Sequence, residues 1–144
     1  METSIIEQLD KSRYNLNKWF TVGWAIWFGT YLVKHLIDSK LIFGVIILAG
    51  MFGWVLAMIN FIKLLRLSKI VNADSKLKEA LNDELHQLYT YKSIRWGFMA
   101  VIAINGIFFS VTMFYQVSAS IVCETTVYLG ILSSSIARLI YNRN

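Results

Sequence analysis

Residues 96–137 decide the fold of this chain, and they read WGFMAVIAINGIFFSVTMFYQVSASIVCETTVYLGILSSSIA. These 42 residues carry a single charged side chain, Glu124. One helix needs about 20 apolar residues to cross the hydrocarbon core of a bilayer, so the stretch has room for two spans. The polar residues 116–120 in its middle predict the turn between them. The stretch therefore predicts two membrane helices joined as a hairpin.

Two shorter runs without charge precede this stretch. The first is WFTVGWAIWFGTYLV, the 15 residues between Lys18 and Lys34, and the second is LIFGVIILAGMFGWVLAMINFI, the 22 residues between Lys40 and Lys63. Neither run alternates between polar and apolar residues, as the strands of a membrane barrel do. We predict an all-α polytopic membrane protein, a single domain over 1–144 with two hairpins and spans at about 19–37, 41–62, 96–115 and 120–140.

The composition excludes other classes of protein. Hydrophobic residues make up 56% of the chain and charged residues 16%, whereas an ordinary soluble domain carries roughly 25% charged residues. This composition argues against a typical soluble enzyme. The only cysteine, Cys123, excludes an internal disulfide framework. The absence of proline agrees with long, unbroken helices.

The distribution of Lys and Arg predicts the orientation in the membrane. Of the 14 Lys and Arg residues, only Lys34 and Lys40 fall on one side of the predicted spans. The other side holds the remaining 12, in the N-terminal segment, the segment 63–95 and the C-terminal segment. By the positive-inside rule, both termini and the segment 63–95 are cytoplasmic. This topology already explains the net charge of +5, so a nucleic-acid partner is not expected.

The segment 63–95 is predicted to form an amphipathic helical hairpin between the second and third spans. Its first half carries a basic stripe, and its second half carries a leucine stripe at helical spacing. The two are separated by residues 72–75, which read as a break and an N-cap. The stripes consist of Lys63, Arg66 and Lys69, and of Leu77, Leu81, Leu85 and Leu88.

Two interpretations of this hairpin remain open. Its helices pack on each other, as amphipathic stripes usually do, or they form a docking surface for a cytoplasmic protein or a second subunit. The basic stripe would also attract the anionic lipid of the cytoplasmic leaflet.

The chain also contains a weak internal repeat. An offset of 77 residues aligns Tyr14 with Tyr91 and Trp19 with Trp96, and the same offset brings Gly53 onto Gly130. Each half would then contain an amphipathic helix followed by a transmembrane hairpin. Parallel duplications of this kind occur in membrane folds.

The sequence predicts no catalytic site, cofactor or metal. In the predicted topology His35 and His86 lie on opposite sides of the membrane and cannot share a metal ion. Cys123 has no second cysteine and no nearby histidine to complete a zinc or redox site. No glycine-rich phosphate loop or nucleophile motif occurs. We therefore predict that the protein is not an enzyme.

Two polar side chains inside the predicted spans are candidate functional residues. Glu124 lies near the outer end of the fourth span, where Lys34, His35 and Lys40 are its candidate partners. It is either an interfacial carboxylate held by those cations or a carboxylate that couples ion movement. Asn105 lies near the centre of the third span. Its amide is expected to hydrogen-bond across helices and to hold them together, rather than to bind a transported ligand.

The stretch Asp83-Glu84-Leu85, with Tyr89, Lys92-Ser93 and Phe98, is similar to a signature in small prokaryotic four-helix membrane proteins of unknown function. That signature reads DER-x-x-x-I-x-x-K-A-x-x-x-x-F and precedes a transmembrane hairpin. Here Leu85 stands in place of its arginine and Ser93 in place of its alanine. The resemblance covers about a tenth of the chain. It implies a prokaryotic inner-membrane protein and supplies no activity.

Two functional hypotheses follow from these patterns. The first is a non-enzymatic integral membrane subunit, namely a scaffold, sensor or anchor. Such a subunit would act through homo-oligomerisation or through a cytoplasmic protein partner. The second is a small transporter, channel or holin-like pore built from several copies of the chain.

Overall fold

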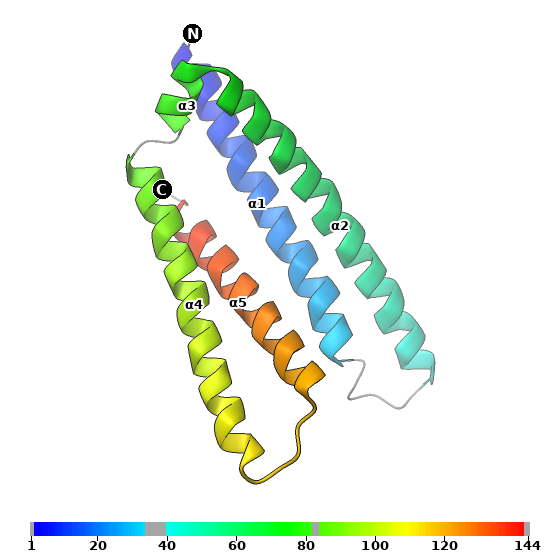
Figure 1. Cartoon of the computed structure of the whole chain (residues 1–144). Coiled ribbons are helices and arrows are strands. Elements are labelled where there is room, and N and C mark those ends of the chain that lie inside the picture. The colour runs from blue at the N-terminus through cyan, green and yellow to red at the C-terminus, as the bar shows by residue number, and fades with distance from the viewer. Residues whose placement is uncertain (1, 34–39, 82–83, 143–144) are drawn as a thin grey trace.

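The computed structural model describes residues 2–33, 40–81 and 84–142, and every regular element in this part of the chain is an α-helix. This part of the chain forms four long helices and one short one (Figure 1). They are α1 (Glu2–Val33), α2 (Lys40–Ala73), α3 (Ser75–Leu81), α4 (Glu84–Thr112) and α5 (Ala119–Tyr141). The predicted all-α class is confirmed for the described residues.

The first two helices are longer than the spans predicted within them. α1 begins at Glu2, so the polar N-terminal segment and the apolar run after Trp19 form one helix of 32 residues. No glycine precedes Gly23, and the chain has no proline. Nothing in the sequence therefore interrupts the backbone hydrogen bonds of the helix. α2 likewise continues through the basic stripe for 34 residues.

The predicted break at residues 72–75 is confirmed. α2 ends at Ala73, and Asp74 then caps α3, because its side chain accepts a hydrogen bond from the Leu77 backbone N–H at 3.4 Å. The turn predicted at 116–120 is found slightly earlier, at 113–118, since α4 ends at Thr112 and α5 begins at Ala119. There the Ser118 hydroxyl accepts a hydrogen bond from the Ile121 N–H at 3.4 Å, as a helix N-cap does.

The leucine stripe is not one stripe, and this prediction is wrong. Leu77 and Leu81 belong to α3, whereas Leu85 and Leu88 belong to α4. In a continuous helix the Leu81 carbonyl would accept from the N–H four residues later. Here it accepts instead from the Arg13 guanidinium on α1, at 3.1 Å. A long-range hydrogen bond thus takes the place of the helical one at the point where α3 ends.

The four long helices form a row in the order α2, α1, α5, α4 (Figure 1). α1 packs along α2, α4 packs along α5, and a smaller contact between α1 and α5 joins the two pairs. α3 lies against α1 and α2. We refer to the end of the row that carries α3, the start of α1 and the end of α5 as the α3 end. α1 and α5 thus have neighbours on both sides, whereas α2 and α4 form the edges.

Glycines let the helices of each pair approach until their backbones touch. A Cβ atom on Gly23 would lie 2.6 Å from the backbone N of Ala57, and one on Gly53 would lie 2.7 Å from that of Trp27. In the other pair, a Cβ atom on Gly97 would lie 2.8 Å from the carbonyl oxygen of Gly130. Small residues at helix contacts are typical of packing inside membranes. The aligned residues Gly53 and Gly130 both lie at such contacts.

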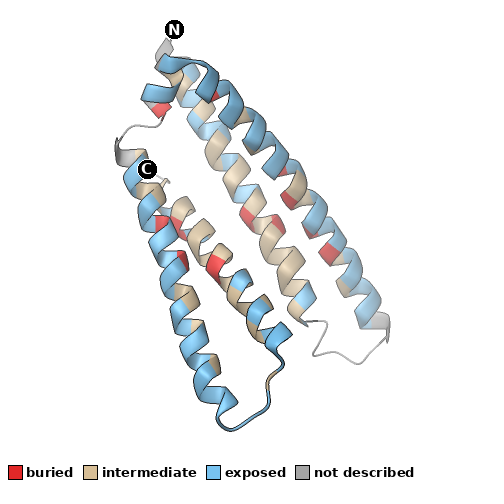
Figure 2. Cartoon of the chain, in the orientation of Figure 1, coloured by how far each residue is buried: buried red, intermediate tan, exposed pale blue. Residues whose placement is uncertain are grey.

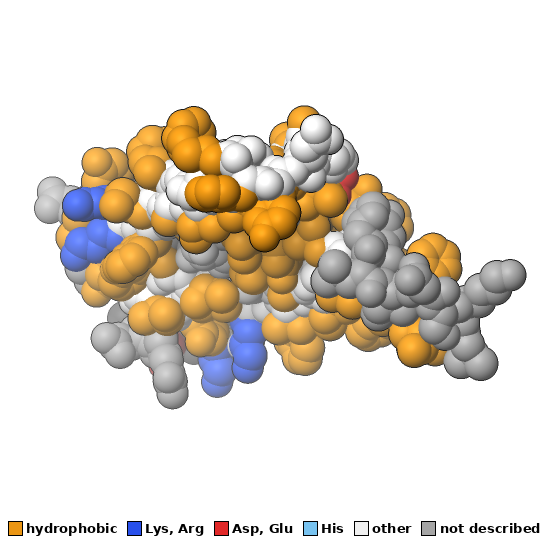
Figure 3. Space-filling model, turned by 90° about the horizontal axis from the view of Figure 1, so that it is seen from below, with side chains coloured by type: hydrophobic (Ala, Val, Ile, Leu, Met, Phe, Trp, Pro, Cys, Tyr) orange, Lys and Arg blue, Asp and Glu red, His pale blue; other side chains and the backbone are white. Residues whose placement is uncertain are grey.

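Three described helical segments are long and apolar enough to cross a membrane: Ile42–Ala73, His86–Thr112 and Ala119–Tyr141. α1 is not among them. Few described residues are buried, and large apolar side chains lie exposed along the helices (Figure 2). Hydrophobic side chains cover most of the face seen in Figure 3 as well. This distribution is consistent with a membrane protein, because lipid rather than a protein core would cover the apolar surface.

Candidate functional site

Glu124 links α5 to α1. Its Oε1 accepts a hydrogen bond from the Ser120 hydroxyl, one turn earlier, at 2.7 Å, and another from the Tyr31 hydroxyl of α1 at 3.2 Å. Its Oε2 is buried and has no hydrogen-bond partner in the described part of the chain. Beside it, the rings of Phe28 and Tyr128 stack with centroids 5.9 Å apart. The carboxylate is therefore part of the contact between α1 and α5.

The cations expected to hold Glu124 cannot be placed. Lys34 and His35 lie outside the described residues, as does the side chain of Lys40. Pairing between Glu124 and these residues stays a prediction. The hydroxyl partners Ser120 and Tyr31 were not predicted, although the spacing of Ser120, one helical turn before Glu124, was a local signal for the first of them.

Among the described residues Asn105 has no hydrogen bond to another helix, and the expected bond across helices stays a prediction. Its amide donates to the Val101 carbonyl of its own helix at 2.8 Å. The residue is exposed, as are Ile102 and Phe109 on the same face of α4. The reason is the position of α4 at the edge of the row, which leaves this face without a neighbouring helix. A polar carboxamide thus lies in the middle of an uncovered apolar face.

The four leucines of the predicted interaction surface have different surroundings. Leu81 is only 5% exposed and Leu77 is half-buried, which is what packing within the chain requires. Leu88 is 45% exposed, and the side chain of Leu85 lies outside the described part. Packing within the chain therefore accounts for Leu77 and Leu81 of α3. Of the leucines whose side chains are described, Leu88 is the exposed one.

The basic stripe is arranged as predicted. Lys63, Arg66 and Lys69 follow one another at helical spacing on α2, and all three are exposed. Their attraction to anionic lipid stays a prediction.

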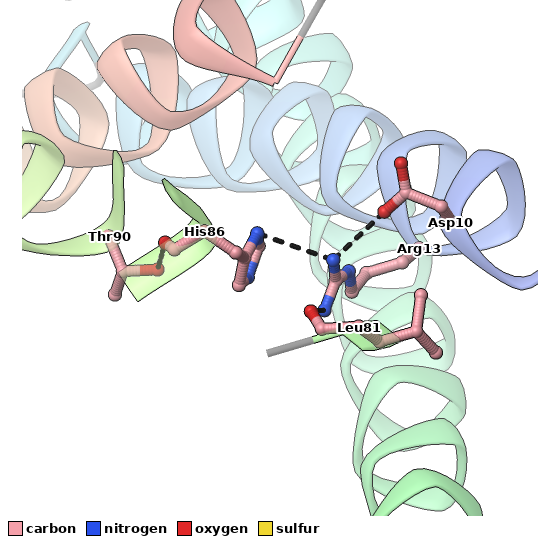
Figure 4. A network of polar contacts seen from close by, with 5 residues as sticks. All are labelled: Asp10, Arg13, Leu81, His86 and Thr90. Atoms are coloured by element: carbon pink, nitrogen blue, oxygen red, sulfur yellow. Dashed lines mark hydrogen bonds and ion pairs between the residues drawn. The ribbon is translucent and has the colours of Figure 1, made fainter. Parts of the chain in front are cut away.

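Sequence reasoning missed a polar cluster at the α3 end, in which Arg13 joins three helices (Figure 4). The Arg13 side chain is 18% exposed and donates to the Asp10 carboxylate at 2.8 Å and to the Leu81 carbonyl at 3.1 Å. It also lies 3.3 Å from Nδ1 of His86 on α4. A guanidinium has donors only, so the histidine nitrogen accepts in this contact.

Arg13 also lines a cavity among α1, α2, α4 and α5. The cavity measures about 360 Å³, and Arg138 from α5 lines it too. A smaller cavity of about 140 Å³ shares Asn17, Phe20 and Arg138 with the first. The Nε atom of Arg138 is buried and has no hydrogen-bond partner in the described part of the chain. The α3 end therefore combines two arginines with a hollow interior.

The sequence held one signal for this cluster. Arg138 interrupts an apolar helix directly after Ser133-Ser134-Ser135 and Ile136-Ala137. A charge in that position needs either a polar neighbour or the membrane surface. The partners of Arg13 gave no such signal, because they are brought together only by tertiary folding.

The described residues contain no group of three or more His, Cys, Asp or Glu side chains arranged to hold a metal ion. Cys123 is a free, exposed cysteine on α5. No family model, curated protein or solved structure matches the chain.

Proposed function

We propose that the protein is a non-enzymatic, four-span subunit of the prokaryotic inner membrane that assembles with other copies of itself. In this proposal the contact between copies is the uncovered face of α4 around Asn105, which we call the Asn105 face. It consists of Ile102, Asn105 and Phe109. The observation that carries the proposal is the exposed carboxamide of Asn105 between apolar side chains.

The physical reason lies in the chemistry of a carboxamide in lipid. An amide group has both donors and an acceptor, so two asparagine side chains from two copies can pair with each other. Hydrocarbon offers no alternative partner, and such pairs contribute about 0.6 to 2 kcal/mol in membranes. Next to Asn105, a Cβ atom on Gly106 would meet nothing within 4 Å. A second helix therefore has room to approach.

The packing of α1 supports the fourth span. α1 lies along α2 in the row of helices, at a distance where the backbones of Gly23 and Gly53 meet. Its apolar part within the described residues, 19–33, is about 22 Å long at about 1.5 Å per residue. That length covers most of a hydrocarbon core of about 30 Å. α1 is therefore proposed as the first span, with its polar N-terminal part outside the core.

Aromatic and basic residues at the α3 end support a membrane interface at that end of the row. The Trp96 indole donates to the Tyr141 hydroxyl at 3.0 Å, and Tyr89 stacks on the Tyr141 ring with centroids 5.7 Å apart. The Lys92 ammonium lies 5.9 Å from the centre of the same ring. Trp, Tyr and Lys are the residues that typically anchor helices at a membrane interface. The cytoplasmic assignment itself rests on the Lys and Arg distribution.

The test compares the assembly of three variants in liposomes, measured by energy transfer between labelled copies. Asn105→Leu should lower the affinity between copies by about threefold to thirtyfold, which corresponds to about 0.6 to 2 kcal/mol. Asn105→Gln keeps the carboxamide and should retain most of the assembly. Ser110→Ala is the control, because Ser110 is exposed on the same helix but lies on another face, five residues and therefore about 140° around the helix from Asn105. Equal assembly of Asn105→Leu and the native protein would contradict the proposal.

One observation favours the second hypothesis, in which several copies form a transporter or pore. The Oε2 atom of Glu124 is buried without a hydrogen-bond partner among the described residues, and such a carboxylate oxygen is available to a proton or a cation. A proton or cation flux that the native protein shows in liposomes and Glu124→Gln lacks would favour this hypothesis over a purely structural subunit.

A further inference from the structure

The two arginines at the α3 end contribute more positive charge to one cavity than the chain neutralises. Arg13 and Arg138 both line the cavity of about 360 Å³. A guanidinium stays protonated in proteins, so neither residue can avoid the cost of burial by losing its charge. Like charges that are partly removed from water destabilise a fold unless an anion or water compensates them.

The hydrogen bonds show which charge is unmatched. The Asp10 carboxylate lies 2.8 Å from Arg13 and compensates it. Arg138 has no such partner among the described residues, and its buried Nε–H has no acceptor. No carboxylate occurs among the described residues that line either cavity. One guanidinium is therefore available to a ligand with negative charge.

The rest of the lining indicates what kind of anion would fit. Around the arginines lie neutral polar groups that can hydrogen-bond a headgroup, namely Asn17, Ser68, Asn72 and His86. The remaining lining is apolar and comes mostly from α2: Phe20, Phe61, Leu64, Leu65, Leu67 and Val71. A volume of about 360 Å³ equals roughly twelve waters at about 30 Å³ each. This is more room than a simple anion needs.

The cavity also lies where a lipid could reach it. Its walls come from α1, α2, α4 and α5, and the edge helices α2 and α4 form no extensive contact with each other. Apolar residues of α2 that line the cavity, such as Phe61 and Leu65, are also exposed at the surface. The lining therefore continues into the apolar surface of the molecule.

We propose that Arg13 and Arg138 bind the phosphate group of an anionic phospholipid, whose headgroup enters the cavity at the α3 end while its acyl chains lie along α2. The planar guanidinium of Arg138 offers paired N–H donors that match two phosphate oxygens. The proposal depends on the membrane location of the protein and not on its self-assembly.

The experiment measures thermal unfolding of the delipidated full-length protein in detergent. Three additives are compared: phosphatidylglycerol, the zwitterionic phosphatidylcholine, and inorganic phosphate. Phosphatidylglycerol should raise the melting temperature of the native protein, because a ligand that binds only the folded state stabilises it. Phosphatidylcholine should raise it much less. In Arg138→Gln, the apparent affinity for phosphatidylglycerol should fall by about tenfold or more.

Arg95→Gln is the matched control, because Arg95 is an exposed arginine of α4 that belongs neither to the basic stripe nor to the lining of the two cavities. It should respond to phosphatidylglycerol as the native protein does. Without lipid, Arg138→Gln should melt at the native temperature or above it, since it removes a half-buried and unpaired charge. Asn105→Leu should keep the lipid response, so a failure of the lipid site and a failure of self-assembly are distinguishable.

The results of these measurements distinguish a lipid phosphate from a free phosphate ion. A full phosphatidylglycerol response in Arg138→Gln would overturn the site, and an equal loss in Arg95→Gln would show attraction to the surface alone. If inorganic phosphate stabilises the native protein as strongly as the lipid does, the lipid assignment is overturned in favour of a free phosphate.

Should Arg138→Gln fail to fold, Arg138→Lys replaces it. That variant keeps the charge but lacks the paired donors, and undiminished affinity there would also overturn the proposal.

Discussion

α1 and α4 begin the two halves of the chain that the offset of 77 residues aligns, yet their surroundings differ. α1 lies between α2 and α5, whereas α4 contacts α5 and forms an edge of the row (Figure 1). At aligned positions, Phe28 of α1 stacks on Tyr128 of α5, and Asn105 of α4 is exposed. The inner helix has an aromatic ring where the edge helix has a carboxamide. This difference is the reason we propose that the edge helix keeps its polar group for a second copy of the chain.

The largest expected effect tests the close contact of the inner helix. Gly23→Val on α1 should destabilise the protein by about 3 kcal/mol or more, because its Cβ atom would lie 2.6 Å from the backbone N of Ala57 and the helices would have to separate. Gly106→Ala on the edge helix has open space and should be neutral or stabilise by up to about 1 kcal/mol. The melting temperatures of the two variants in detergent measure this difference. Equal losses would contradict the contrast between an inner and an edge helix.

A smaller effect is expected at the α3 end. Leu81→Ala removes a buried side chain and should destabilise the protein by about 2 to 3 kcal/mol. Leu88→Ala on α4 removes a side chain that is 45% exposed and should cost less than about 1 kcal/mol. Unfolding in detergent again provides the measurement. If Leu88→Ala instead abolishes co-purification of a cytoplasmic protein, a docking role for the exposed residue replaces the packing role.

Structural features that depend on residues close together in the sequence were predictable. The end of α2 before Asp74 and the start of α5 after Ser118 follow from short polar side chains that cap the next helix. The apolar runs likewise predicted α2, α4 and α5. The single helix over the leucines was wrong, since α3 ends at Leu81, whose carbonyl accepts a hydrogen bond from Arg13, a residue 68 positions away.

The candidate sites were less predictable for the same reason. Tyr31 and Glu124 are 93 residues apart, and Arg13 and His86 are 73 residues apart. No local pattern connects residues at such separations. Arg13 and Arg138 counted only toward the orientation of the chain, although Arg138 lies within an otherwise apolar run. Helical periodicity also could not tell that α4 lies at an edge of the row, and this position leaves Asn105 exposed.

The most direct test of the account is cysteine cross-linking between copies in native membranes. In a Cys123→Ser background, which removes the free cysteine, Ile102→Cys places a thiol one turn before Asn105 on the Asn105 face. Leu48→Cys is the control, on an exposed position of the other edge helix. A disulfide requires Cα atoms about 4.4 to 6.8 Å apart. We predict a covalent dimer after mild oxidation for Ile102→Cys and little dimer for Leu48→Cys. The absence of a dimer at position 102, or equal amounts of dimer at both positions, would contradict the proposed contact.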